Sequence, residues 1–227
     1  MNDPTITKDM LDELRSRLES NFKSGAMSEK RYRHTLEVEK MAARLGEIYI
    51  PDKVSDLRAA GLLHDVTKEL STDKHIELAE RFGIALSELD VCAPKTLHAM
   101  TATAVIGEEY REFATETVLG CVRWHTTGRS GMTLCEKLVY LADYIDMSRT
   151  FDDCVKLRSF FFCDELDSMP YEQKLEHLDR TLLLSYDMTL SGLIESGTPI
   201  SPDTIAARNE LAVKFCAKNK AEKKNKN

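Results

Sequence analysis

The sequence predicts an all-α protein, and three observations indicate that class. Apolar residues recur at helical spacing along most of the 227-residue chain. Valine, isoleucine and threonine do not gather into alternating runs, and no Asn-Gly hairpin signal occurs. Residues that favour helix starts and stops separate the apolar stripes. These features favour a set of packed helices over any sheet.

The first two expected helices lie before Pro51. The leucines of the first helix are Leu11, Leu14 and Leu18. Gly25 follows that helix, and the second begins at Ser28, a favourable N-cap residue. The second helix ends before Pro51, because proline cannot continue a helix. Its apolar stripe consists of Val38, Met41, Leu45 and Ile48. His34 lies one turn before the stripe and therefore faces the same way.

The middle of the chain predicts four further helices. A helix from about Ser55 carries Leu57, Ala60, Gly61 and His64. A short helix over Lys74–Phe82 stops at Gly83, a residue typical of helix ends. The chain then turns around Pro94. Two apolar stripes follow, the first with His98, Ala102, Val105 and Ile106, the second with Val118, Cys121, Val122 and His125.

Capping signals place the next helix. Residues 126–131 are polar and contain two glycines, which is typical of a loop. Thr133 and Glu136 have the spacing of a capping box, so a helix is expected to start there and to continue through Asp143.

The C-terminal part predicts two more helices and a tail. A long helix is expected from Pro170 to Ile194, closed by Gly197, and Pro202 can open another. The Lys-rich stretch 214–227 is expected to be frayed and solvated. The expected organisation is a helical extension at 1–26, one main domain at 27–196, and a C-terminal helix with its tail at 197–227.

The composition indicates a globular protein in a reducing compartment. Apolar residues make up 42% and charged residues 30%. No apolar run approaches the ~18 residues of a membrane span. The six cysteines are scattered, and no secretory signal precedes them, so we expect reduced thiols and a cytoplasmic location. The net charge of −7 argues against DNA as a partner, although it leaves a small phosphorylated ligand open.

Six histidines and aspartates lie on apolar helical faces, where a buried polar group needs a partner. They are His34, His64, Asp65, His98, His125 and Asp143. A shared metal ion would satisfy them together. Each residue also has an ordinary interpretation, as a hydrogen-bonded core histidine or a helix-capping group. His75 and His177 lie among charged residues and are expected at the surface.

One motif favours the metal. Ala-Gly-Leu-Leu-His64-Asp65-Val-Thr-Lys68, with His34 upstream and Asp143 downstream, resembles the H…HD…D signature of the HD phosphohydrolases. The stretch from Ser28 to Thr35 and the block from Trp124 to Arg149 are similar to the YqeK-type symmetrical bis(5′-nucleosyl)-tetraphosphatases. The similarity covers roughly Met27 to Ile194. It implies an HD-domain helical bundle with an interior metal site.

The resemblance also implies the activity and the residues that perform it. Members of that family with bound iron cleave diadenosine tetraphosphate into two ADP. The implied metal ligands are His34, His64, Asp65 and Asp143. The implied substrate contacts are Arg31, His34, Lys68, His98, His125, Thr126, Arg129, Asp143 and Arg149. The implied catalytic residues are Asp65, Lys68, His98 and His125.

Several alternatives stay open on the sequence alone. Manganese, zinc, nickel or magnesium could replace iron, and a second ion could bind near His98 and His125. Another HD nucleotide phosphohydrolase, or a nucleotide-sensing module without turnover, would share the motif. The run Phe160–Phe162 departs from the family pattern, which leaves the nucleoside preference open. We interpret this run as core or as a packing interface, which could support a homodimer.

Overall fold

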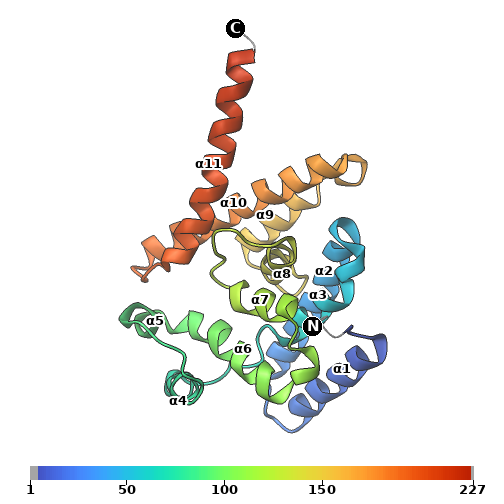
Figure 1. Ribbon diagram of the computed structural model, residues 1–227, viewed down its shortest axis with the longest axis vertical. Helices are drawn as coiled ribbons and strands as arrows, with labels where there is room; N and C mark the ends of the chain where they lie inside the picture. Colours follow the sequence, from blue (N-terminus) through green and yellow to red (C-terminus); the bar gives the residue numbers. More distant parts are fainter. Residues whose placement is uncertain (1–4, 226–227) are drawn as a thin grey trace.

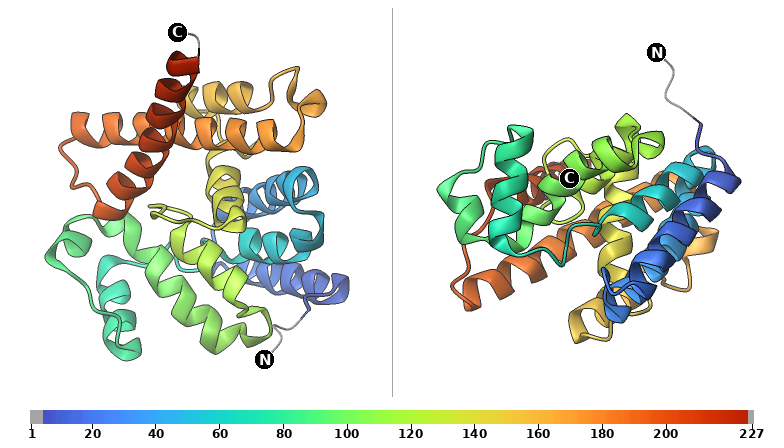
Figure 2. Two further views of the ribbon diagram at one scale, coloured as in Figure 1. Left: turned by 45° about the horizontal axis from the view of Figure 1, so that its top comes forward. Right: turned by 90° about the horizontal axis from the view of Figure 1, so that it is seen from below.

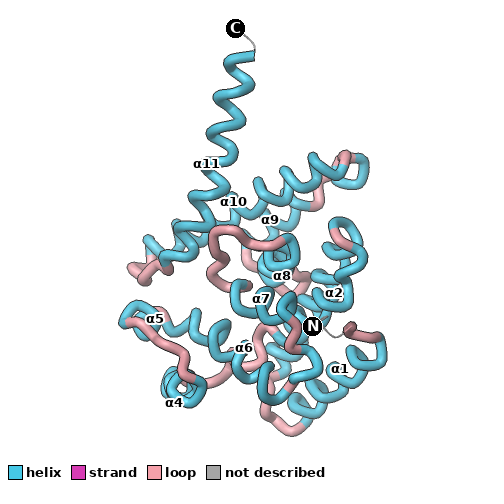
Figure 3. Tube along the Cα trace, viewed as in Figure 1, coloured by secondary structure: helices cyan, strands magenta, loops and turns pink. Residues whose placement is uncertain are grey.

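The computed structural model describes residues 5–225, with side chains described through residue 218. Within this part of the chain all regular structure is helical (Figures 1 and 3), which confirms the predicted all-α class. None of the helices in residues 5–225 combines the length and the apolar character that a bilayer crossing needs.

The first half of the chain forms α1 (Lys8–Lys23), α2 (Glu29–Tyr49), α3 (Val54–Leu63), α4 (Thr72–Phe82), α5 (Glu88–Cys92) and α6 (Leu97–Glu109). The second half forms α7 (Glu116–Trp124), α8 (Leu134–Ile145), α9 (Asp152–Phe161), α10 (Tyr171–Glu195) and α11 (Pro202–Asn225). Short 3-10 turns lie at Pro51–Lys53, Pro94–Thr96, Arg111–Phe113 and Leu166–Ser168.

The predicted helix boundaries agree with the structure wherever a capping signal was present. The Ser28 side chain accepts a hydrogen bond from the Arg31 amide at the start of α2. Thr133 and Glu136 form a reciprocal capping box at the start of α8. Gly83 ends α4 with a φ of 65°, a left-handed conformation that favours glycine.

Two short helices were not predicted, and one prediction for the tail was wrong. Helices α5 and α9 were not expected from the sequence, and the N-cap residue of α9 is Phe151, which offers no capping side chain. The Lys-rich stretch is helical through Asn225, and only residues 226–227 of it lie outside the described part. Lys214 is 2.6 Å from Asp179 on α10, so α11 is anchored where it crosses that helix.

Helix α3 lies at the centre of the bundle, in contact with α1, α2, α7 and α8. Its residues from Leu57 onward are buried except Arg58, which explains why this part of the helix consists almost entirely of apolar residues. Gly61 faces the backbone of α2, where a Cβ atom would come within 2.9 Å of Glu39 Cα. This close approach brings the start of α2 beside the end of α3, where the histidine-aspartate pair lies.

The remaining helices surround this centre. Leu14 and Leu18 of α1 are fully buried in the same core, so the expected N-terminal extension packs directly on the domain. Helices α4 and α5 form the flank opposite α1 in both views of Figure 2. Helix α10 packs on α9 and α11, and the far end of α11 projects from the body of the molecule (Figure 1).

Candidate metal centre

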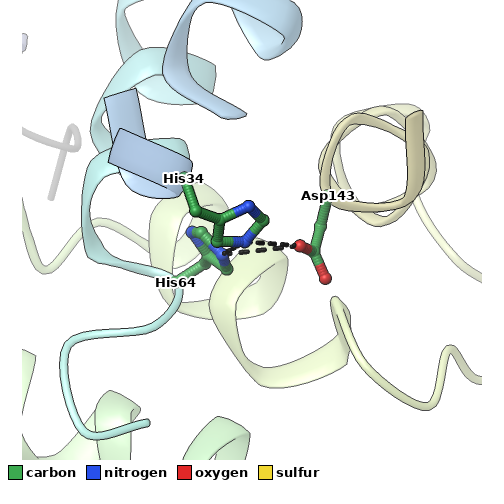
Figure 4. A group of neighbouring side chains, drawn as sticks. All are labelled: His34, His64 and Asp143. Atoms are coloured by element: carbon green, nitrogen blue, oxygen red, sulfur yellow. Dashed lines mark hydrogen bonds and ion pairs between the residues drawn. The ribbon is translucent and has the colours of Figure 1, made fainter. Parts of the chain in front are cut away.

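Residues on or next to three helices bring the four candidate metal ligands together. His34 comes from α2, His64 and Asp65 from the end of α3, and Asp143 from the last turn of α8. Figure 4 shows His34, His64 and Asp143 pointing toward one another. The structure therefore brings together the four ligands that the sequence analysis expected.

The distances between the donor atoms fit one ion. His34 Nε2 lies 3.3 Å from His64 Nε2, 3.0 Å from Asp143 Oδ1 and 3.6 Å from Asp65 Oδ2. His64 Nε2 lies 3.2 Å from Asp65 Oδ2 and 3.7 Å from Asp143 Oδ1. Donor atoms about 2.1 Å from a common ion lie roughly 3.0–3.4 Å apart. Three of the five distances lie in this range, and the two longer ones, 3.6 and 3.7 Å, need only small shifts of the side chains to reach it.

Hydrogen bonds behind the two histidines fix their orientation. His64 Nδ1 is 2.7 Å from the Gly61 carbonyl oxygen, which places the proton on Nδ1 and leaves Nε2 as a ligand atom. His34 Nδ1 is 3.3 Å from Asp146 Oδ2 and 3.4 Å from Ser148 Oγ. Asp146 is fully buried, and the sequence analysis missed its role. The sequence feature that could have indicated this role is the spacing of Asp146 from Asp143, which is about one helical turn.

A second group of donors meets the other oxygen of Asp65. Asp65 Oδ1 lies 3.2 Å from His98 Nε2 and 3.6 Å from His125 Nε2, and the two ring nitrogens are 2.9 Å apart. Thr126 Oγ1 is 3.0 Å from each of them. Asp65 Oδ1 is buried and accepts no hydrogen bond from any described residue. Asp65 thus presents one oxygen to each histidine group.

Three cations border the cluster. The Arg31 guanidinium pairs with Asp65 Oδ2. Arg149 Nη2 is 2.5 Å from Asp143 Oδ1, and Arg149 Nε is 3.3 Å from Asp146 Oδ2. Lys68 Nζ is 3.0 Å from His98 Nε2 and 3.9 Å from Asp65 Oδ1. Positive groups on three sides of a carboxylate and imidazole cluster are suited to a phosphorylated ligand.

The expected substrate residue Arg129 lies elsewhere. Its Nη2 donates to Glu136 Oε1 at 3.0 Å, and its guanidinium is 5.5 Å from the centre of the Trp124 ring. Arg129 lines a groove of about 750 Å³ between α7 and the start of α8, which none of the six clustered histidines and aspartates borders. In the described part of the chain, the contacts of Arg129 are thus with Glu136 and Trp124, and its role as a substrate contact stays a prediction.

Burial and mutual charge set the protonation of the ligands. Burial alone would raise the pKa of Asp65 and Asp143, but His64 beside Asp65 and Arg149 beside Asp143 hold both pKa values well below the usual range. Burial lowers the pKa of His64, and it lowers the pKa of His98 to about 3. The aspartates are therefore ionised and these histidines neutral at pH 7, the forms in which both bind metals.

The prediction that His75 lies at the surface was wrong. His75 is 3% exposed, and its Nδ1 is 2.8 Å from Thr101 Oγ1. Thr101 Oγ1 is 3.1 Å from Thr67 Oγ1, which donates to the His98 carbonyl oxygen. His75 and Ala79 form the buried side of α4, whereas the charged neighbours of His75 lie on its exposed side. His177 is half-buried, with Nε2 3.0 Å from the Phe161 carbonyl oxygen.

Comparisons with known proteins agree with this site. The HD domain family model matches residues 31–148, a range that contains every residue of the cluster. A symmetrical bis(5′-nucleosyl)-tetraphosphatase of Staphylococcus aureus is 32% identical over 81% of this chain and 87% of its own length. One of Halalkalibacterium halodurans is also 32% identical, over 82% of this chain and 90% of its own.

A solved structure is similar as well. It is described as a predicted HD superfamily hydrolase involved in NAD metabolism from Clostridium acetobutylicum, and it is 33% identical to this chain. The superposition has a TM-score of 0.74 and covers 89% of this chain and 97% of the other. The similarity thus extends over the whole bundle and not only over the metal ligands.

Proposed function

The chain belongs to the HD-domain family, as a relative of its symmetrical bis(5′-nucleosyl)-tetraphosphatases, and from this premise we propose that it hydrolyses diadenosine tetraphosphate and related dinucleoside tetraphosphates to two nucleoside diphosphates. The observation that carries the proposal is the cluster of His34, His64, Asp65 and Asp143, which is bordered by Arg31, Lys68 and Arg149. Three cations around one metal site suit a chain of phosphates better than a single phosphate ester.

We assign the metal ligands to His34, His64, Asp65 and Asp143, and we propose iron as the ion. The donor set of imidazoles and carboxylates suits iron, manganese, zinc and nickel alike. When bound, such an ion lowers the pKa of water and polarises a phosphoryl oxygen. The orphaned oxygen of Asp65, together with His98 and His125, supports a second ion on the opposite side of Asp65.

The cations hold the phosphates in place. Arg149 and Arg31 can each make forked contacts to phosphate oxygens, and Lys68 can reach the same phosphate group, because it lies one turn after Asp65. If they hold the two phosphates of one ADP half, the scissile anhydride lies at the outer edge of the β-phosphate. The second ADP is then the leaving group.

The low pKa of His98 bears on the expected catalytic roles. Since burial lowers the pKa of His98 to about 3, this ring is neutral at pH 7 and lacks the second ring proton that an imidazolium would give to a leaving phosphate. We therefore assign His98 to metal ligation or to hydrogen bonding with the phosphate, with Thr126 beside it. Asp65 stays ionised and can orient the attacking water as well as bind the metal.

Hydrolysis in ¹⁸O-labelled water tests the proposal directly. We expect ADP as the sole nucleotide product of diadenosine tetraphosphate, with the label on the β-phosphate of one of the two molecules. A mixture of ATP and AMP would contradict symmetrical cleavage. Phosphate release from mononucleotides, without action on dinucleotides, would instead favour a nucleotide phosphatase. Tight binding without turnover would favour a nucleotide sensor.

A further inference from the structure

The segment between α8 and α9 exposes large apolar side chains beside the metal centre. Arg149 in this segment contacts Asp143, whereas Met147 is 60% exposed and Phe151 is 69% exposed. Val155, one turn into α9 from Phe151, is 42% exposed. Neighbouring exposed apolar side chains at the edge of a polar site are typical of a surface that a ligand covers.

This segment is held in place, so the exposure of Phe151 belongs to an ordered loop. Arg158 on α9 donates to the carbonyl oxygens of Ile145, Asp146 and Arg149. The Ser148 amide donates to Asp146 Oδ1 at 2.8 Å. The same contacts that fix Arg149 against the metal ligands therefore also fix the backbone that leads into Phe151.

Phe151 also occupies an unusual position for an aromatic residue. It is the N-cap residue of α9, a position that favours Ser, Thr, Asp and Asn because their side chains accept hydrogen bonds from free amides. Its own side chain makes no capping hydrogen bond, and it is largely outside the core. Neither helix capping nor core packing accounts for a phenylalanine here.

We propose that Phe151, together with Met147, is the surface on which a nucleobase of the substrate stacks while Arg149 holds the adjoining phosphates. The proposal rests on the proposed function, because a nucleotide is the ligand. Arg149 and Phe151 are two residues apart, so their Cα atoms lie within roughly 7 Å. A base is joined to its phosphates through the ribose, so it must rest beyond the edge of the cation site, where Phe151 lies.

Stacking has a consequence for specificity. Every nucleobase has a π face, so an aromatic platform accepts purines and pyrimidines with modest differences. The platform therefore predicts activity on several dinucleoside tetraphosphates, with purines preferred through their larger stacking area. The run Phe160–Phe162 does not serve this purpose, since Phe161 is fully buried and Phe162 packs against Arg44.

The test compares two ligands that share the phosphate site. We expect Phe151→Ala to weaken ADP binding about tenfold, the usual effect of removing one stacking partner, and to leave the binding of inorganic pyrophosphate unchanged. Phe151→Tyr should restore the affinity for ADP. Phe160→Ala is the matched control, because Phe160 lies on α9 and is 41% exposed. Calorimetry with the metal-loaded protein measures both ligands.

Normal ADP affinity in Phe151→Ala, or an equal loss of ADP and pyrophosphate binding, would overturn the inference. So would conversion of a wild-type dimer to monomers by Phe151→Ala, because the exposed apolar side chains would then form an interface between two copies of the chain. Wild-type turnover of diadenosine tetraphosphate, assayed in parallel, tests the proposed function separately. A wild-type protein that binds ADP through Phe151 but cleaves no dinucleotide would refute the function and retain the stacking platform.

Discussion

Asp65 is the residue on which the site depends most. One of its oxygens faces His34 and His64, and the other faces His98 and His125. Its side chain is almost completely buried, and it is ionised. A buried carboxylate depends on positive charge nearby, which Arg31 supplies at Asp65 Oδ2 and which a bound metal ion would increase.

The first prediction concerns the metal. His64→Ala and Asp65→Ala are each expected to abolish bound metal and activity, because each removes a proposed ligand at the end of α3. The helical content should stay near wild type, because neither residue belongs to the apolar core. Elemental analysis and circular dichroism of the purified variants measure both. His177→Ala, away from the cluster, is the control. Wild-type metal content in both ligand variants would refute the assignment.

The second prediction concerns the phosphates. Lys68→Ala and Arg149→Ala should retain the metal and weaken ADP binding by about 1.5–3 kcal/mol, the usual effect of losing a charge-assisted contact. That corresponds to a loss of about tenfold or more in affinity. Calorimetric titration with ADP measures it. Arg33→Ala serves as the control, because this exposed cation pairs only with Glu29 along α2. Unchanged affinity in both variants would place the phosphates elsewhere.

The third prediction concerns pH. Burial alone would lower the pKa of His34, but Asp143 and Asp146 outweigh it and raise that pKa to about 9 in the metal-free protein. A metal ion binds neutral imidazole, so below about pH 9 the His34 proton must be released before the metal can bind. Metal affinity should therefore rise with pH, by about tenfold per pH unit for one proton released, and level off above about 9.

Titration of Mn²⁺ into chelator-treated protein across that range measures the dependence. Asp146→Asn removes one of the carboxylates that raise the pKa of His34, so its plateau should begin at lower pH. An affinity that stays constant between pH 7 and 9 in the wild type would show that His34 carries no proton there.

At the scale of the elements, the contact between α2 and α3 determines the site. The two helices approach closely because Gly61 has no side chain where it meets the backbone of Glu39. His34 lies near the start of α2 and His64 follows the last residue of α3, so the separation of these two helices sets the distance between their ring nitrogens. A network of His75, Thr101 and Thr67 similarly joins α4 and α6 to the turn that carries Lys68.

The fourth prediction tests that contact. Gly61→Ala would place a Cβ atom 2.9 Å from Glu39 Cα, so the helices must separate, and we expect a loss of about 1–3 kcal/mol in the free energy of unfolding. Metal affinity should fall as well, because the ligands move apart. Gly107→Ala is the control, since it lies in α6 with nothing within 4 Å, and it should be neutral or stabilising. Urea denaturation compares the two, and equal stabilities would contradict the packing argument.

At the scale of the whole molecule, the C-terminal helix supports a loop of the site. Glu210 on α11 accepts hydrogen bonds from the Gly131 amide at 2.6 Å and from the Ser130 hydroxyl, and Thr204 donates to the Thr127 carbonyl oxygen at 2.9 Å. The same loop carries Thr126 against His98 and His125. Residues beyond the matched HD region therefore help to position the loop that carries Thr126.

The fifth prediction follows from this support. Glu210→Ala should lower kcat/KM about two- to fivefold, the effect of losing roughly 0.5–1 kcal/mol of hydrogen bonding to the loop, without changing the metal content. Steady-state kinetics with diadenosine tetraphosphate measures the change. Arg208→Ala, on the same helix and paired with Asp187 at the surface, should behave as the wild type. Equal kinetics in the two variants would mean that the loop keeps its position without α11.

The all-α class, most helix boundaries and the four side chains that we propose as metal ligands could be predicted from the sequence alone. These features depend on local signals: the period of the apolar residues, capping residues such as Ser28 and Thr133, and the adjacent pair His64 and Asp65 after a small-residue helix. Each can be recognised without knowing which helices pack together.

How the proposed metal ligands are supported, and which residues surround them, became visible only in the tertiary structure. The burial of Asp146 behind His34, the burial of His75, the distance of Arg129 from the cluster and the exposure of Phe151 all depend on which face of a helix meets another element. Packing between separate helices determines these environments. The periodicity of a single helix shows that one side is apolar, but it does not show which element covers that side.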